Sequence, residues 1–137
     1  MVKHYKELGI HRLSVEVRKR VFALSKAWPK EEAYSLTSQI RRSSRSVGAC
    51  LAEAWAKRRY ERHFVSKLTD ALAEAEETVE WLDVALECTY LDEGEHEALA
   101  ARCRQIAGGL VRMMREPERW CGPAALTREE SESYDSL

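Results

Sequence analysis

The sequence predicts an all-α protein that folds as an antiparallel, up-down-up-down four-helix bundle. Three observations lead to this prediction. Apolar residues recur at spacings of three and four in four separate stretches. Only 6 glycines and 3 prolines occur among the 137 residues. The connections between the stretches are short, which favours antiparallel neighbours. We assign the bundle to residues 1–116 and an irregular acidic tail to residues 117–137.

The first predicted helix spans residues 10–28. Its apolar residues have helical spacing: Ile10, Leu13, Val17, Val21, Leu24 and Trp28. Pro29 ends it, because proline disfavours the helical conformation in the residue before it. Residues 29–34 then form a single predicted turn that leads into the next helix.

The second predicted helix spans residues 36–58, and the rest of the chain is organised around it. One stripe faces the core: Leu36, Ile40, Ser44, Val47, Leu51, Ala54 and Trp55. We place its N-cap at Thr37 or just before it. Its other side carries arginines in the first half and almost no side chains in the second. This pattern predicts a helix that is buried on two sides, once in its own bundle and once against a partner.

The third predicted helix spans residues 64–88 and has the most regular pattern in the chain. Its core stripe is Phe64, Leu68, Ala71, Ala75, Val79, Leu82 and Leu86, and carboxylates line its outer face.

The fourth predicted helix begins at Asp92, which forms a capping box with Glu95, and ends before Pro117. Its stripe is Leu99, Cys103, Ile106, Leu110 and Met113. Each of Gly108 and Gly109 costs about 1 kcal/mol of helix stability against alanine, so we expect close packing or a bend there.

Composition predicts a cytoplasmic protein. No stretch of 18 or more apolar residues predicts a membrane span, and the N-terminus lacks the apolar core of a signal peptide. The four cysteines form no Cys-x-x-Cys pair, which fits small apolar residues in a reducing compartment.

Charge is segregated along the chain. Residues 1–67 hold 16 Lys or Arg against 6 Asp or Glu, and residues 68–101 hold none against 11. This asymmetry indicates a polyanion partner for the basic part, or subunits that meet basic face to acidic face in a cyclic homo-oligomer.

The predicted nucleic-acid-binding residues lie on and after the second helix: Arg41, Arg42, Arg45, Lys57, Arg58, Arg59 and Arg62. Arginine binds phosphate through a planar fork, and a ring would repeat the charge toward one RNA. The alternative is that these arginines form salt bridges to Glu76, Glu80 and Asp83 of a neighbouring subunit, and both roles can hold for different arginines.

The predicted oligomer interface consists of small residues and one apolar row among the acids: Gly48, Ala49, Ala52, Ala56, Trp81 and Val84. The alternative for the small residues is helix propensity alone.

Catalytic and metal sites have little support in the sequence. The four histidines have no serine or cysteine partner at a recognisable spacing, so we expect no catalytic residues. A Glu-x-x-His motif at Glu93 and His96 is the one match to a di-iron bundle site, but it falls in the first turn of a helix. We therefore expect no metal and no cofactor.

Four short motifs resemble a known family. They are Tyr-Lys-Glu-Leu at residues 5–8, Trp-Pro-Lys-Glu-Glu at 28–32, the run ending Gln-Ile-Arg-Arg-Ser at 34–43, and Leu-Ala-Glu at 51–53. The chain resembles the four-helix-bundle proteins encoded in 23S ribosomal RNA intervening sequences, a fold family that includes the accessory variability determinants of diversity-generating retroelements. Cys50, Ala54 and His11 depart from the usual Asn, Gly and aromatic residue of that family.

The resemblance implies a homopentameric ring that binds nucleic acid and a reverse transcriptase, without enzymatic activity. The leading hypothesis is therefore an oligomeric RNA-binding scaffold. The alternative is a structural or protein-interaction protein from an rRNA intervening sequence, without RNA affinity of its own.

Overall fold

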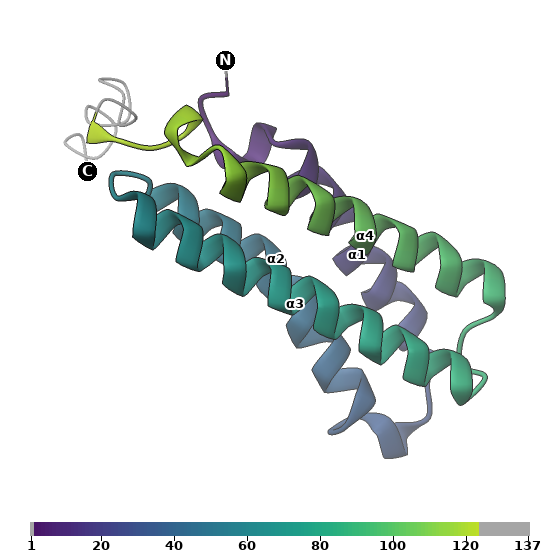
Figure 1. Cartoon of the computed structure of the whole chain (residues 1–137). Coiled ribbons are helices and arrows are strands. Elements are labelled where there is room, and N and C mark those ends of the chain that lie inside the picture. The colour runs from purple at the N-terminus through teal and green to yellow at the C-terminus, as the bar shows by residue number, and fades with distance from the viewer. Residues whose placement is uncertain (1, 124–137) are drawn as a thin grey trace.

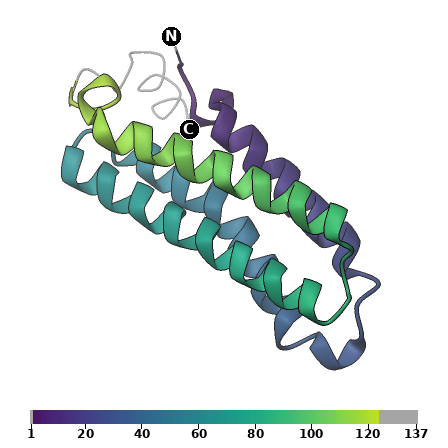
Figure 2. The same ribbon diagram turned by 45° about the vertical axis from the view of Figure 1, so that its right-hand side comes forward.

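Four helices make up the protein in a computed structural model that describes residues 2–123. They are α1 (Gly9–Ser25), α2 (Leu36–Ala56), α3 (Glu61–Glu87) and α4 (Glu93–Arg115), with 3-10 turns η1 (Tyr5–Glu7), η2 (Lys30–Glu32) and η3 (Pro117–Arg119). Figures 1 and 2 show consecutive helices running antiparallel, with α2 beside α3 and α1 beside α4. The predicted four-helix bundle is confirmed.

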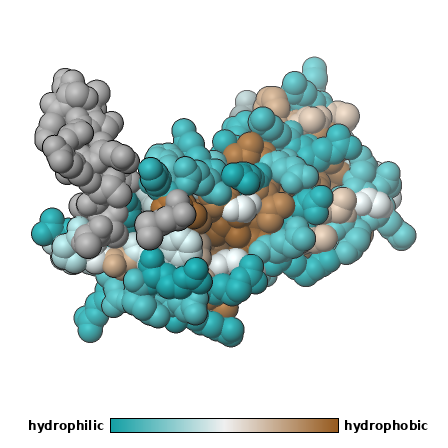
Figure 3. All heavy atoms as spheres, turned by 90° about the horizontal axis from the view of Figure 1, so that it is seen from above, coloured by the Kyte–Doolittle hydropathy of each residue, from teal (hydrophilic) through white to brown (hydrophobic). Residues whose placement is uncertain are grey.

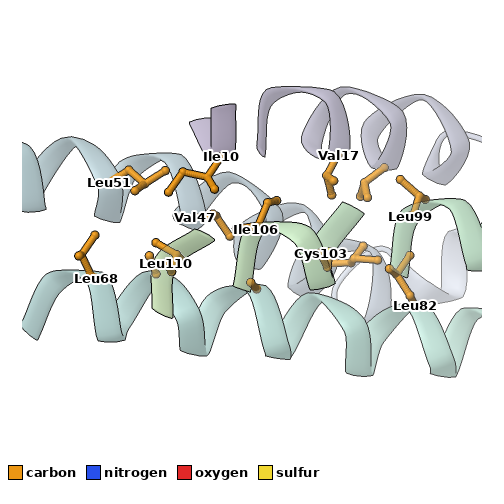
Figure 4. Packing of buried hydrophobic residues seen from close by; sticks show 14 of the residues in the cluster. Ile10, Val17, Val47, Leu51, Leu68, Leu82, Leu99, Cys103, Ile106 and Leu110 are labelled. Atoms are coloured by element: carbon orange, nitrogen blue, oxygen red, sulfur yellow. The ribbon is translucent and has the colours of Figure 1, made fainter. Parts of the chain in front are cut away.

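The core lies between the four helices and receives side chains from all of them (Figure 4). Val17 of α1, Val47 and Leu51 of α2, and Leu82 of α3 are buried there. Every residue of the predicted α2 stripe is buried. The stripe therefore sets the rotation of α2 and decides which of its other side chains reach the surface.

The core stripe of α3 differs from the prediction in two places. Thr78 and Ala85 are fully buried, whereas the predicted Val79 and Leu86 are only half-buried. Thr78 is accommodated because its Oγ1 donates a hydrogen bond to Oγ of the buried Ser43 on α2, at 2.9 Å. A polar pair in the core is not visible in apolar periodicity alone.

The N-terminal ends of α2 and α4 differ in their capping. Helix α2 begins at Leu36 with Ser35 as N-cap, which agrees with the prediction of Thr37 or a residue just before it, but the Ser35 side chain makes no cap hydrogen bond. The predicted capping box of α4 is confirmed, since the Glu95 backbone N–H donates to Asp92 Oδ1 at 2.7 Å and the Asp92 N–H donates to Glu95 Oε1 at 3.1 Å.

Helices α1 and α4 meet closely at Gly109. A Cβ on this residue would overlap Cγ2 of Ile10, so only glycine allows Ile10 to pack against the α4 backbone. Gly108 has no such neighbour. The expected close packing is confirmed for one glycine of the pair.

The tail was predicted to span residues 117–137, of which residues 124–137 lie outside the described part of the chain. The first part of this segment contacts the bundle. The Trp120 ring lies 6.1 Å from that of Trp55, and the Gly122 N–H donates to the Arg58 carbonyl at 2.9 Å. Within residues 2–123, none of the helices combines the length and apolar character needed to cross a bilayer.

Candidate nucleic-acid interface

Phe22 lies at the surface between α1 and α2, and positively charged side chains surround its ring. Its side chain is 37% exposed because it stands off the apolar stripe of α1. The Arg41 guanidinium carbon lies 4.7 Å from the ring centroid, and Arg41 Nε donates to Oγ of the buried Ser25 at 2.8 Å. This hydrogen bond holds the Arg41 side chain, which comes from α2, against α1.

Two more cations approach the same ring. Lys26 Nζ lies 4.7 Å from the Phe22 centroid, and the Arg45 guanidinium carbon lies 5.3 Å from it. The negative face of an aromatic ring attracts cations, but three positive charges around one ring also repel one another. An anion that binds here would relieve that repulsion.

Arg18 and Lys19 extend the positive surface along α1. They line a shallow pocket of about 410 Å³ together with Phe22 and Arg45. We call the six residues of this surface the basic seam: Arg18, Lys19, Phe22, Lys26, Arg41 and Arg45. Within residues 2–123, none of its five cations forms an ion pair with a carboxylate.

Arg42 does not join the basic seam. It lies one residue, about 100°, further around α2, and it contacts α3 instead. Its Nη1 lies 3.1 Å from Glu74 Oε2, and its Nη2 pairs with Glu77. Arg42 is therefore partnered by carboxylates of its own chain, at Glu74 and Glu77.

Arg58 is also removed from the predicted set, because it is buried with only 3% of its surface exposed. Its guanidinium stacks on Trp55 at 4.3 Å, and Nη1 donates to the Trp55 carbonyl at 2.8 Å. This arginine closes the end of the core and cannot bind phosphate from solvent.

The other three predicted cations, Lys57, Arg59 and Arg62, are exposed at the turn between α2 and α3. Sixteen residues separate Arg41 from Lys57, which is about 24 Å along the helix. The seven predicted binding residues therefore do not form one surface. They divide into the basic seam, the partnered Arg42, the buried Arg58 and this distant group.

The predicted interface residues also divide. Ala49 and Ala56 are exposed and Ala52 is half-buried, so these three still face outward. Gly48 is buried against α1 of its own chain, where a Cβ would come 2.9 Å from Arg18 Nη1. Trp81 and Val84 are half-buried and pack against the core of the same chain. For Gly48, Trp81 and Val84 the close contact is internal.

Another apolar surface was not predicted. Leu8, Ile10, Met113 and Trp120 line a pocket of about 470 Å³ between the start of α1 and the end of α4. Figure 3 views the molecule from above Figure 1 and shows hydrophobic side chains gathered in the middle of a largely hydrophilic face.

The histidine of the Glu-x-x-His motif has a structural partner. His96 Nε2 lies 2.7 Å from Asp83 Oδ1, so it links α4 to α3. Among the described residues, no group of three or more His, Cys, Asp or Glu side chains is arranged to hold a metal ion.

Sequence reasoning overlooked the contribution of α1 to the basic seam. The signal was present, because Phe22 is a large apolar residue off the α1 stripe and has a cation four residues before it and four after it, at Arg18 and Lys26. That α1 packs beside the Arg41 and Arg45 face of α2 depends on the tertiary fold.

Comparisons with known proteins agree with the fold. A family described as 23S rRNA-intervening sequence protein matches residues 6–112. A solved structure of a protein with unknown function from the S23 ribosomal protein family of Bacteroides thetaiotaomicron is similar, with 28% sequence identity and a TM-score of 0.69. The similarity covers 77% of this chain and 95% of that one. No curated protein matches the sequence.

Proposed function

We propose that this chain, which belongs to the family of 23S rRNA-intervening sequence proteins, is a non-enzymatic scaffold that binds RNA through the basic seam. The observation that carries the proposal is the group of five cations around the half-exposed Phe22, none of them paired with a carboxylate in the described part of the chain. Arg42, the neighbouring arginine on α2 that has carboxylate partners, does not belong to this group.

The chemistry of the basic seam suits an RNA backbone. Arg18, Arg41 and Arg45 offer guanidinium forks, which bind phosphate oxygens through two hydrogen bonds. The described elements are all helices and turns, and none presents a sheet or loop of the kinds that read RNA bases. Binding is therefore driven by charge and shape and depends weakly on sequence.

We further propose that the chain forms a cyclic homo-oligomer. One feature supports this: the outward-facing Ala49, Ala52 and Ala56, none of which belongs to the basic seam, leave room for another helix. The number five, and a reverse transcriptase as protein partner, come from the resemblance to the retroelement accessory proteins.

A matched pair of variants on α2 tests the RNA site. Arg45→Gln and Arg42→Gln each remove one positive charge from the same helix. We expect Arg45→Gln to weaken the binding of a labelled hairpin RNA several-fold, because glutamine cannot pair with a phosphate as the guanidinium does. Arg42→Gln should bind almost as the parent protein does, because that arginine already has carboxylate partners. Equal losses of affinity in both variants would contradict the assignment of the site to the basic seam.

The oligomer proposal has its own test. Ala52→Glu places a large charge on the small-residue face, and Ala98→Glu places the same charge on α4 at an exposed position outside the core. Light scattering should show folded monomers for Ala52→Glu and an unchanged oligomer for Ala98→Glu. A parent protein that is monomeric, or an unchanged mass for Ala52→Glu, would contradict the proposed interface.

The ion pairs of Arg42 favour a second candidate function. Since carboxylates of α3 partner this arginine within the chain, carboxylates of a neighbouring subunit can in the same way partner Arg41 and Arg45. The protein would then be a structural or protein-interaction scaffold without RNA affinity, and hairpin RNA would bind neither the parent nor the seam variants.

A further inference from the structure

Tyr60 is an exposed aromatic residue in the turn between α2 and α3. Its side chain is 57% exposed, and it is the N-cap residue of α3. The His63 ring lies edge-on to it, with centroids 5.4 Å apart, and the Arg59 guanidinium carbon lies 5.8 Å from the Tyr60 centroid. An aromatic pair with a cation beside it is therefore presented to solvent.

The backbone around Tyr60 is held in place, which fixes the point from which the ring projects into solvent. The Tyr60 N–H donates to the Lys57 carbonyl at 3.1 Å, and the Tyr60 carbonyl accepts from the Phe64 N–H at 3.0 Å. The Phe64 side chain is fully buried and anchors this first turn of α3 in the core. Tyr60 and His63 consequently stay on the outer side of the turn.

A pocket of about 700 Å³ lies beside these rings. The pocket is lined from the turn by residues 59–63, which include the carboxylate of Glu61, and from the segment after α4 by Glu118, Cys121 and Gly122. That segment is positioned by the hydrogen bond from the Gly122 N–H to the Arg58 carbonyl. A volume of about 300–1,000 Å³ is usual for small-ligand sites, and a single nucleotide is a ligand of this class.

We propose that this turn pocket binds one unpaired nucleotide of the RNA, a proposal that rests on the proposed function. The base stacks on the Tyr60 ring, since aromatic side chains bind bases through their π-faces with little preference among them. Arg59 and Arg62, which make no ion pair within the described residues, hold the adjoining phosphate. The carboxylate of Glu118 can accept a hydrogen bond from a base amino group.

The distance between the two sites gives the turn pocket a separate role. Residues 41 and 57, which mark the two sites along α2, are about 24 Å apart. The basic seam contacts a phosphate backbone of any kind, whereas a stacking site requires a base that is free of its partner. The protein should therefore prefer a hairpin with a single-stranded extension to the same hairpin with a blunt end.

The experiment compares two labelled RNAs, a blunt hairpin and the same hairpin with a short single-stranded 3′ extension. We expect the parent protein to bind the extended RNA about 5- to 150-fold more tightly, which corresponds to one stacked base. Tyr60→Ala should abolish this preference, and Tyr60→Phe should retain it because the ring is kept. Tyr34→Ala is the matched control, since Tyr34 is another exposed tyrosine, at 98%, and lies outside the pocket.

The outcomes separate the two proposals. Binding of the blunt hairpin without any gain from the extension would overturn the turn pocket and leave the basic seam in place. The same conclusion would follow if Tyr60→Ala kept the preference, or if Tyr34→Ala abolished it equally. Failure of both RNAs to bind at low salt would overturn the proposed function as well. Circular dichroism and the oligomeric mass of each variant show whether a weaker affinity arises from misfolding instead.

Discussion

Thr89 adopts a backbone conformation that a β-branched residue disfavours. Its φ is +62°, and it occupies the position after the C-cap of α3. The Thr89 N–H donates to the Leu86 carbonyl at 3.0 Å and the Tyr90 N–H donates to the Ala85 carbonyl at 2.9 Å. These two bonds form a Schellman motif, in which glycine is the usual residue at this position.

Replacing Thr89 by glycine should therefore stabilise the fold. We expect Thr89→Gly to raise the free energy of unfolding by about 1 kcal/mol, because glycine adopts the left-handed conformation without the steric cost of a Cβ. Urea denaturation measures the change. Thr89→Ala is the control, since alanine retains the Cβ and should gain less. A glycine variant that is less stable than the parent would refute the assignment of strain to this residue.

His11 gives the fold a pH dependence. Burial lowers the pKa of His11, and the nearby charges of Arg18, Lys6 and His4 lower it further. The unfolded chain, with a histidine pKa of about 6.5, therefore binds this proton before the folded chain does. The stability that the neutral ring contributes is complete above about pH 6.5 and is lost as the pH falls below that value.

A His11→Phe variant should remove this dependence. Between about pH 7.5 and pH 5, we expect its free energy of unfolding to fall less steeply than that of the parent, because phenylalanine carries no titrating group. Tyr34→Phe serves as the control, since it changes an exposed side chain and leaves every histidine in place, and it should retain the slope of the parent. Parallel curves for His11→Phe and the parent would show that His11 does not cause the pH dependence.

Helical geometry explains which residues of the basic seam were predictable. Arg41 and Arg45 lie about 40° apart around α2, whereas Arg42 lies about 100° from Arg41. The sequence therefore predicts that Arg41 and Arg45 share one face of the helix. It does not predict which residues of other helices contact that face. Phe22 on α1 and Glu74 on α3 come from distant parts of the chain, and a helical pattern carries no information about which helix packs on which side.

At the scale of elements, Gly108 and Gly109 differ although they are adjacent. We expect Gly109→Ala to destabilise the protein by about 1–3 kcal/mol, because its Cβ would overlap Ile10 and force α1 and α4 apart. Gly108→Ala should instead stabilise it by up to about 1 kcal/mol, because a Cβ there meets only Arg112 Nη1 at 3.6 Å. Chemical denaturation of both variants measures the difference. Similar effects of the two substitutions would contradict the close approach of α1 at Gly109.

Helices were the most predictable elements, because their signals are local. The capping box at Asp92 and the stripes of apolar residues lie within single helices, and their helices form as expected. The predicted α3 stripe omitted the buried Thr78, because its burial depends on a hydrogen bond to another helix, whereas the predicted Val79 packs only at the edge of the core. Residues 117–122 were assigned to a tail because their contacts, Trp120 with Trp55 among them, join distant parts of the chain.

At the scale of the molecule, the bundle converts charge segregation along the chain into charge segregation in space. Helices α1 and α2 are neighbours, so their cations converge at the basic seam. Helix α3 carries most of the acidic segment and packs on the other side of α2, where Glu74 and Glu77 partner Arg42. A small net charge of −1 therefore coexists with a surface able to attract a polyanion.

The most direct test of the central claim is the salt dependence of RNA binding, measured by fluorescence anisotropy with a labelled blunt hairpin. The parent protein is compared with an Arg41→Gln, Arg45→Gln double variant whose oligomeric mass has been checked. If the basic seam holds phosphates, the logarithm of the binding constant falls linearly with the logarithm of salt concentration. The slope for the double variant should then be smaller by about 0.7–0.9 for each phosphate that the variant no longer neutralises. Equal slopes for the two proteins, or no binding by the parent at low salt, would contradict an RNA-binding role for the basic seam.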